Sequence, residues 1–344
     1  MTSFAGNPSQ RAERVRVARH RRRRSIRGRV ASRALVVLST VLTRLPERPL
    51  TRAAWAIGGV LYRVQPGRRR LVHDNLARVV SYLAEHDLAN EATAAAARDG
   101  KALDHLTRAA FGHYVRSYLE GATLQRYKSS RELARVTPDD PAVADVAFPA
   151  GRTGPTIVVG LHFGAVEIPA LWATARGVPI LAPMETVADP DIQDYFERSR
   201  GGTGLKVVPL EGAAAKVRAA LANRETVALV SDRALSGSGT RIDFFGAPAR
   251  LPAGPAVLAL ETRAPAWVVA TRRAGNNYPT RIYRLDLPAI GTPKERMTGF
   301  MANQIGIFER VIADAPEQWW TLFFQIWDDI PADPTSRAAA DATS

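Results

Sequence analysis

The segment Thr156-Ile-Val-Val-Gly-Leu-His162-Phe-Gly164-Ala-Val-Glu167 decides the fold class, because its pattern predicts a buried strand, a tight turn and a helix start. The run from Thr156 to Leu161 has no polar face, which is typical of a strand covered by helices on both sides. Gly164 permits a tight turn after that strand. The pattern therefore puts His162 at the carboxyl end of a strand and Glu167 in the first turn of the next helix.

The chain beyond residue 155 repeats this alternation of strand and helix. Short apolar, β-branched runs predict further strands at residues 178–183, 205–210, 226–231 and 266–271. Helical stretches lie between them, near residues 165–175, 190–200, 212–223 and 253–262. Strands separated by helices predict an α/β fold with a mixed, mostly parallel central sheet flanked by helices. In such folds the loops at the strand ends usually carry the functional site.

One large domain with helical additions accounts for most of the chain. The 344 residues are 46% hydrophobic and 23% charged, which is enough apolar material for a large core. Residues 68–135 have a helical pattern, with a buried stripe expected from Phe111, Tyr114, Val115, Tyr118 and Leu119. We expect a domain over residues 67–330, with its catalytic α/β core at 150–330, and a disordered polar tail at 331–344.

The N-terminal residues form a strongly basic arm. Residues 1–29 hold ten arginines against the single acid Glu13, so this stretch carries +9 of the net charge of +14. We expect residues 1–30 to be disordered and to seek polyanions. Anionic lipid headgroups and nucleic acid both meet that requirement.

Two short apolar runs after the arm favour lipid over nucleic acid. Residues 34–43 and 53–62 are each far shorter than the roughly 20 residues that cross a bilayer as a helix. A signal peptide is disfavoured, because a long polar arm precedes the first run. We expect residues 31–66 to form interfacial membrane helices anchored by Trp55 and Tyr62, with the arm at the cytoplasmic face of the plasma membrane. The alternative is that both runs are ordinary core helices.

Composition excludes several kinds of catalytic chemistry. The sequence contains no cysteine, which excludes disulfides, thiolate metal sites and a cysteine nucleophile. The six histidines lack the close spacing of metal ligands, and no Gly-x-Ser-x-Gly elbow is present. We therefore expect neither a metal nor another cofactor, and no covalent enzyme intermediate.

His162 is the strongest catalytic candidate, because no other histidine follows an apolar strand and precedes a glycine turn. Glu167, five positions later, can fold back to accept the ring N–H and so raise the basicity of the other ring nitrogen. Backbone N–H groups near Ala165 are candidates for holding an oxyanion. The alternative is a histidine with a purely structural hydrogen bond.

The element His162-x-x-x-x-Glu167 resembles the catalytic motif of the lipid A late acyltransferase family, and the chain is most similar to its phosphatidylinositol mannoside acyltransferase branch. Other elements between residues 68 and 327 resemble the family in order and spacing: Arg70-Leu-Val-His-Asp-Asn75-Leu76, Val230-Ser-Asp232-Arg233, Ile242-Asp-Phe244-Phe245-Gly246, Leu251-Pro-Ala-Gly254 and Pro316-Glu317-Gln318-Trp319. The resemblance implies the fold of the glycerolipid acyltransferases. It also implies His162 as the general base, Glu167 as its partner and Asp232 as a second acid, with Glu185 helping to hold the acceptor.

The end of the chain departs from the lipid A enzymes. Those enzymes continue the terminal Pro-Glu-x-Trp element with a tryptophan and a basic His-Arg cluster, whereas this chain continues Trp320-Thr-Leu-Phe-Phe-Gln325-Ile-Trp327. The departure disfavours a lipid A precursor as the acceptor and favours a sugar-bearing or glycerol-based lipid.

Three arginines are further binding candidates. Arg233 is either a clamp for a phosphate or the salt-bridge partner of the neighbouring Asp232. Arg198 and Arg200 either bind the phosphates of an acyl donor or complement the dipole at a helix end.

These features together predict a membrane-surface acyltransferase. The donor would be acyl coenzyme A or acyl carrier protein, the acceptor a hydroxyl of a lipid or glycolipid such as a phosphatidylinositol mannoside, and the docking partner an anionic membrane surface. A glycerolipid acyltransferase of the lysophosphatidic acid type is the alternative enzyme. A basic nucleic-acid-binding protein is the non-enzymatic alternative, but no DNA-binding motif supports it and no nucleic acid partner is expected.

Overall fold

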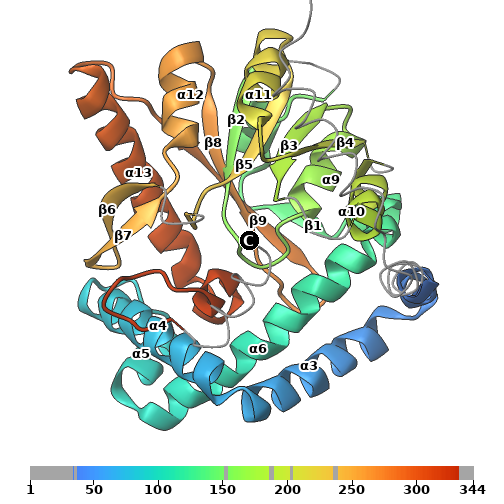
Figure 1. Ribbon diagram of the computed structural model, residues 1–344, viewed down its shortest axis with the longest axis vertical. Helices are drawn as coiled ribbons and strands as arrows, with labels where there is room; N and C mark the ends of the chain where they lie inside the picture. Colours follow the sequence, from blue (N-terminus) through green and yellow to red (C-terminus); the bar gives the residue numbers. More distant parts are fainter. Residues whose placement is uncertain are drawn as a thin grey trace, which may run out of the picture.

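The computed structural model describes residues 34, 37–150, 154–185, 190–201, 204–234 and 239–332 (Figure 1). The basic arm predicted at residues 1–30 lies outside the described residues, as does most of the tail predicted at 331–344. The helices are α3 (Glu47–Val64), α4 (Pro66–Glu85), α5 (Glu91–Arg98), α6 (Gly100–Ala122), α7 (Ser130–Leu133), α8 (Pro141–Ala147), α9 (Ile168–Ala175), α10 (Pro190–Gly201), α11 (Ala213–Ala222), α12 (Gly254–Thr262) and α13 (Pro293–Ala313), with 3-10 helices η1 (Leu124–Lys128), η2 (Pro316–Gln318) and η3 (Trp320–Phe323).

A seven-stranded sheet in the order β1-β9-β8-β2-β5-β3-β4 forms the centre of the described structure. All of its pairings are parallel except that between β8 and β9. The prediction of a mixed, mostly parallel sheet flanked by helices is therefore confirmed. The strands are β1 (Val136–Pro138), β2 (Thr156–Gly160), β3 (Ile180–Met184), β4 (Leu205–Pro209), β5 (Thr226–Val230), β8 (Ala266–Thr271) and β9 (Tyr278–Leu285), and a separate hairpin pairs β6 (Thr240–Phe244) with β7 (Ala247–Leu251).

The central strand β2 is buried on both faces, as its apolar sequence predicts. Ile157 and Val159 point into the larger core, which also contains residues of α11, α12 and α13. Val158 points to the opposite face, into a core shared with Phe148 and Ala173 beside α8 and α9. Alternate side chains of a strand face opposite sides of its sheet, so both faces of β2 need helical cover.

The structure adds strands that the alternation of apolar runs does not predict. In β6 the exposed charged residues Arg241 and Asp243 alternate with less exposed positions. The turn between β6 and β7 is Phe245-Gly246, with φ angles of 49° and 72°, as a two-residue hairpin turn of type I′ requires. The strained Phe245 is held because its backbone N–H donates to the Glu309 carboxylate at 2.8 Å. The Phe-Phe-Gly element is thus a hairpin tip.

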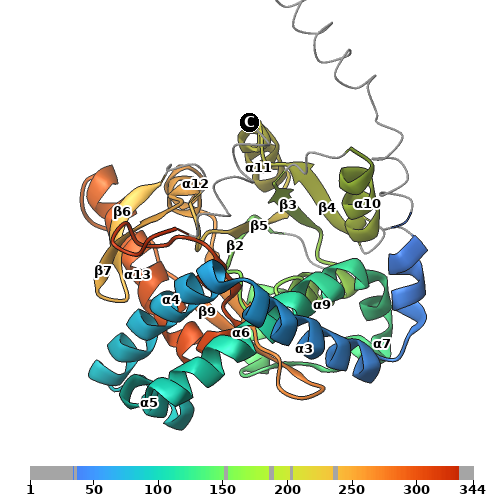
Figure 2. The same cartoon turned by 60° about the horizontal axis from the view of Figure 1, so that its bottom comes forward.

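The N-terminal helices pack on the end of the molecule away from α11 and α12, with α3 alongside α6 (Figures 1 and 2). Their close approach is possible because Gly58 lies against the backbone of Gly112, and an added Cβ at Gly58 would come within 2.7 Å of it. In α6, Phe111 and Val115 are buried as expected, whereas Tyr118 is 55% exposed, so the predicted stripe is wrong at that position.

Exposed apolar side chains lie along α3 and along the helical residues 37–44 before it, interspersed with the exposed arginines at positions 44, 48, 52 and 63. The exposed apolar residues include Val37, Leu38, Val41, Ile57, Val60 and Val64. Of the two expected membrane anchors, Trp55 is 42% exposed, whereas Tyr62 packs edge-on against Phe111 and donates a hydrogen bond to Asp104. Within the described residues, every helix is too short or too polar to span a bilayer.

Candidate active site

His162 and Asp232 meet at the carboxyl edge of the sheet. The parallel strands β2 and β5 pair with Gly160 opposite Val230, and each of the two residues lies two positions beyond its strand's last pair. His162 Nδ1 is 2.8 Å from Asp232 Oδ1, and the His162 backbone N–H donates to Oδ2 at 3.0 Å. Strand register, rather than proximity in sequence, therefore joins these two predicted site residues.

Asp232 is a fully buried carboxylate with a complete set of donors. Besides the two contacts from His162, its Oδ2 accepts the Trp319 indole N–H at 2.8 Å and the Thr321 hydroxyl at 2.6 Å. Burial raises the pKa of Asp232, but the charge of His162 and the hydrogen bonds from His162, Thr321 and Trp319 outweigh it and lower the pKa to about 2. Asp232 is therefore ionised throughout the physiological pH range.

The ionised Asp232 determines the tautomer of His162. A carboxylate can only accept, so Nδ1 must carry the proton and the neutral ring has its lone pair on Nε2. The ring lies 4.3 Å, centroid to centroid, from that of Trp320 and keeps 20% of its side-chain surface exposed. Nε2 is thus the ring nitrogen that can accept a proton, as a general base requires, and the acid that orients the ring is shielded from water.

Glu167 occupies a different place from the one that its spacing suggests. It is the N-cap residue of α9, which begins at Ile168, and its carboxylate forms an ion pair with Arg200 of α10. Asp232, rather than Glu167, contacts the Nδ1 of His162. The catalytic role predicted for Glu167 stays a prediction, now with Arg200 as its observed partner.

The turn after His162 is fixed by backbone contacts. Gly164 has φ +52°, and an added Cβ would lie 2.1 Å from the carbonyl oxygen of Thr271. The Gly164 N–H donates to the Gln318 carbonyl at 3.0 Å, and the Ala165 N–H donates to the Thr271 carbonyl at 2.9 Å. The amides of Gly164 and Ala165 are therefore already used and cannot hold an oxyanion, so the expectation of oxyanion donors near Ala165 stays a prediction for the neighbouring backbone N–H groups only.

The other predicted binding residues lie on neighbouring loops. Arg233 forms an ion pair with Glu185, which follows β3, and its guanidinium lies 4.2 Å from the centre of the Phe324 ring. Its acidic partner is thus Glu185 and not the adjacent Asp232. Arg198 lies on α10, two residues before Arg200, and its side chain is outside the described part of the structure.

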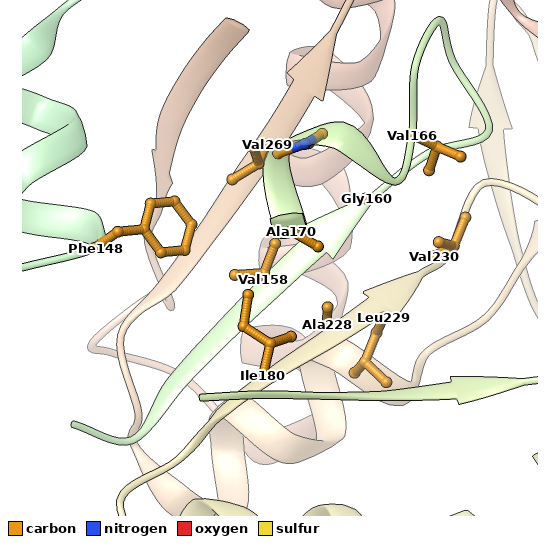
Figure 3. A pocket seen from close by; sticks show the side chains of 11 residues that line it. Phe148, Val158, Gly160, Val166, Ala170, Ile180, Ala228, Leu229, Val230 and Val269 are labelled. Carbon is orange, nitrogen blue, oxygen red and sulfur yellow. The ribbon is translucent and has the colours of Figure 1, made fainter. Parts of the chain in front are cut away.

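An apolar cavity begins beside this site and runs along one face of the sheet (Figure 3). Val158 and Gly160 of β2 and Ala228 and Val230 of β5 line it, and Gly160 and Val230 are two residues before His162 and Asp232. Figure 3 shows Phe148 at the end opposite Val166 and Val230. The remaining lining residues are equally apolar: Pro169, Ala170, Ile180, Leu229 and Val269.

The sequence does not predict the hydrogen bonds from Trp319 and Thr321 to Asp232. Trp319 belongs to a recognisable element, the terminal Pro-Glu-x-Trp, but the spacing of that element does not reveal what it contacts. Thr321 carries no signal, because a threonine in an aromatic run has no distinguishing pattern. Their link to Asp232, more than 80 residues earlier, exists only in the folded chain.

Comparison with known proteins agrees with the site. The profile of the bacterial lipid A biosynthesis acyltransferases matches residues 150–327, more than half of the chain. A phosphatidylinositol mannoside acyltransferase of Mycolicibacterium smegmatis is 28% identical over 223 residues, 64% of this chain and 71% of the relative. One of Mycobacterium tuberculosis is 26% identical over 216 residues, 62% of this chain and 66% of the relative. The chain therefore belongs to the bacterial lipid A biosynthesis acyltransferase family and is an enzyme that transfers acyl groups.

Proposed function

We propose that the enzyme moves a fatty acyl chain from an acyl thioester to a hydroxyl of a membrane glycolipid of the phosphatidylinositol mannoside class. The observation that carries the proposal is the imidazole of His162, which contacts the buried Asp232 carboxylate two residues beyond the lining of an apolar cavity. The names of the two mycobacterial relatives support the class of acceptor.

In the proposed reaction, Nε2 of His162 removes the proton of the acceptor hydroxyl as its oxygen attacks the thioester carbon. The carbon–sulfur bond then breaks, and the imidazolium returns the proton to the departing thiolate, so an ester and a free thiol are formed. Asp232 stabilises the imidazolium between these two steps. No covalent enzyme intermediate is required, in keeping with the absence of cysteine.

The apolar cavity would hold the acyl chain of the donor. Its lining offers hydrocarbon contacts along its length, and burial of a methylene group contributes about 0.8 kcal/mol. A chain that enters past Val166 and Val230 would leave the thioester carbon beside His162. Coenzyme A and acyl carrier protein both present their acyl group through a flexible phosphate-bearing arm, and either serves as the proposed donor.

The ion pairs Arg233–Glu185 and Arg200–Glu167 are proposed to bind the polar parts of the substrates. Glu185 is 54% exposed in its side chain and would accept hydrogen bonds from sugar hydroxyls, with Arg233 orienting it. Glu167 would act through its ion pair with Arg200, and Arg198, on the same helix, is the proposed contact for a donor phosphate.

The membrane surface is the proposed docking partner, at the cytoplasmic face of the plasma membrane. The exposed apolar side chains of residues 37–64 would enter the headgroup region, and the basic arm of residues 1–30 would hold anionic lipids. We propose that residues 31–66 are the docking segment and that residues 67–330 form the acyltransferase domain.

The acceptor class can be tested by thiol release. The protein has no cysteine, so a thiol reagent reports only the coenzyme A that leaves palmitoyl-coenzyme A. We expect release to depend on added phosphatidylinositol mannoside, with mass spectrometry detecting the acylated glycolipid. Lysophosphatidic acid and palmitoyl-acyl carrier protein serve as the competing acceptor and donor. Acylation of lysophosphatidic acid alone would refute the glycolipid assignment and favour the glycerolipid alternative.

Membrane docking can be tested by sedimentation with vesicles. The triple substitution of Ile57, Val60 and Val64 by serine should lower binding to phosphatidylglycerol-containing vesicles about tenfold or more, because the apolar surface that enters the interface is lost. Val146→Ser removes an equally exposed valine on α8 and should leave binding unchanged. Binding should also weaken as salt rises. Equal loss in both variants would count against this docking face.

A further inference from the structure

The terminal segment of residues 316–327 lies directly against the turn that carries His162. Phe163 and Trp319 form an antiparallel β-bridge, and the backbone N–H of Trp320 donates to the His162 carbonyl at 2.9 Å. The Gly164 N–H donates to the Gln318 carbonyl on the same segment. Backbone hydrogen bonds therefore fix this segment to the turn that carries His162.

We infer that Trp319 and Thr321 are positioning residues for acyl transfer. They hold the Asp232 carboxylate in the orientation in which its Oδ1 faces Nδ1 of His162. This inference rests on the proposed role of His162 as the base. Three donors converge on Oδ2 of Asp232, namely the Trp319 indole N–H, the Thr321 hydroxyl and the His162 backbone N–H. Oδ1 is left to face the ring, 2.8 Å from Nδ1.

The geometry explains why two side-chain donors are needed. A carboxylate on a single Cβ can rotate about its Cβ–Cγ bond, and rotation would carry Oδ1 out of the plane of the imidazole. Donors from two directions on Oδ2 oppose that rotation. They also stabilise the charged form, since hydrogen bonds to a buried carboxylate offset its desolvation. A loosened Asp232 would let His162 exchange its tautomers and lose the Nε2 lone pair for part of the time.

The segment that supplies these donors is itself held by hydrogen bonds in its middle and at Trp327. The Asn75 side chain of α4 donates to the carbonyls of Leu322 and Phe324 at 2.8 Å and 3.0 Å. The Trp327 indole N–H donates to the Phe244 carbonyl at 3.0 Å. Trp319 also packs on the hairpin tip, with its ring 5.4 Å from that of Phe244. Elements distant in sequence thus converge to make the donors rigid.

The inference is tested by Thr321→Val against Thr321→Ser. Valine keeps the shape of threonine and removes only the hydroxyl, whereas serine keeps the hydroxyl. We expect valine to lower kcat with palmitoyl-coenzyme A and phosphatidylinositol mannoside about tenfold or more at unchanged KM, the size of effect seen for outer groups that orient metal-ligating histidines and carboxylates. Serine should restore most of the rate. Nitrogen-15 NMR of the His162 ring should report one neutral tautomer in the wild type and a mixture in the valine variant.

The controls separate this inference from the proposed function. An active, folded His162→Ala protein would overturn the proposed function. Only the inference would be overturned if His162→Ala is inactive while Thr321→Val keeps a normal kcat and a single His162 tautomer. A drop in kcat that serine does not rescue, with an unchanged ring spectrum, would also overturn it. Should Thr321→Val fail to fold, Trp319→Phe, which keeps an aromatic ring and removes the other donor, decides by the same two measurements.

Discussion

His162→Ala should lower kcat for acyl transfer by roughly 10²–10⁴-fold, the usual contribution of a general base, without weakening donor binding. Asp232→Asn should cost a comparable factor, because the neutral amide cannot enforce the Nδ1–H tautomer or stabilise the imidazolium. The double variant should lose little more than His162→Ala alone, since residues that act as one unit are strongly non-additive. Steady-state release of coenzyme A, with thermal melting as the check on folding, measures all three variants.

The pH dependence distinguishes the catalytic pair from a structural one. Asp232, with its pKa lowered to about 2, stays ionised over the assay range, so a fall in rate on acidification reports protonation of the imidazole. In Asp232→Asn the imidazolium loses the adjacent negative charge, so the acid limb should move to lower pH. Loss of stability with additive effects and an unmoved limb would point to a structural role instead.

Ala228→Phe should abolish the use of long acyl chains while sparing short ones. Ala228 lines the cavity from β5, and a phenyl ring there would occupy the space proposed for the acyl chain. We expect kcat/KM for palmitoyl-coenzyme A to fall by about 10²-fold or more, because a few methylene groups in a fitted apolar pocket decide between substrates by factors of this order. A series from octanoyl- to stearoyl-coenzyme A, measured by thiol release, gives the profile.

Phe148→Leu is the matched variant, and it should shift the preferred acyl chain length in the opposite direction. Phe148 is at the far end of the cavity, so a smaller side chain should lengthen it and move the preference toward longer chains (Figure 3). An unchanged chain-length profile in both folded variants would show that the acyl chain binds elsewhere. A uniform loss for every chain length in Ala228→Phe would indicate a distorted site rather than a filled pocket.

Local pattern was sufficient for the α/β alternation and for the position of His162. Strands covered on both faces are apolar at nearly every position, so β2, β5 and β8 can be recognised from this one sequence. A histidine that directly follows such a strand must emerge at its carboxyl edge. The strands that pattern missed have mixed burial, since β6 alternates charged with less exposed residues and β9 carries arginines at positions 281 and 284. Their pairing depends on neighbours, which no short window contains.

Only the tertiary structure decided which acid serves His162. Spacing pointed to Glu167, five residues away, but the turn at Gly164 and the helix start at Ile168 leave its carboxylate beside Arg200. The register of β2 and β5 instead brings Asp232 to Nδ1 from 70 residues away. The same holds for the donors on Trp319 and Thr321. Periodicity encodes which face of an element is buried, whereas the partner of a buried charge is set by how distant elements pack.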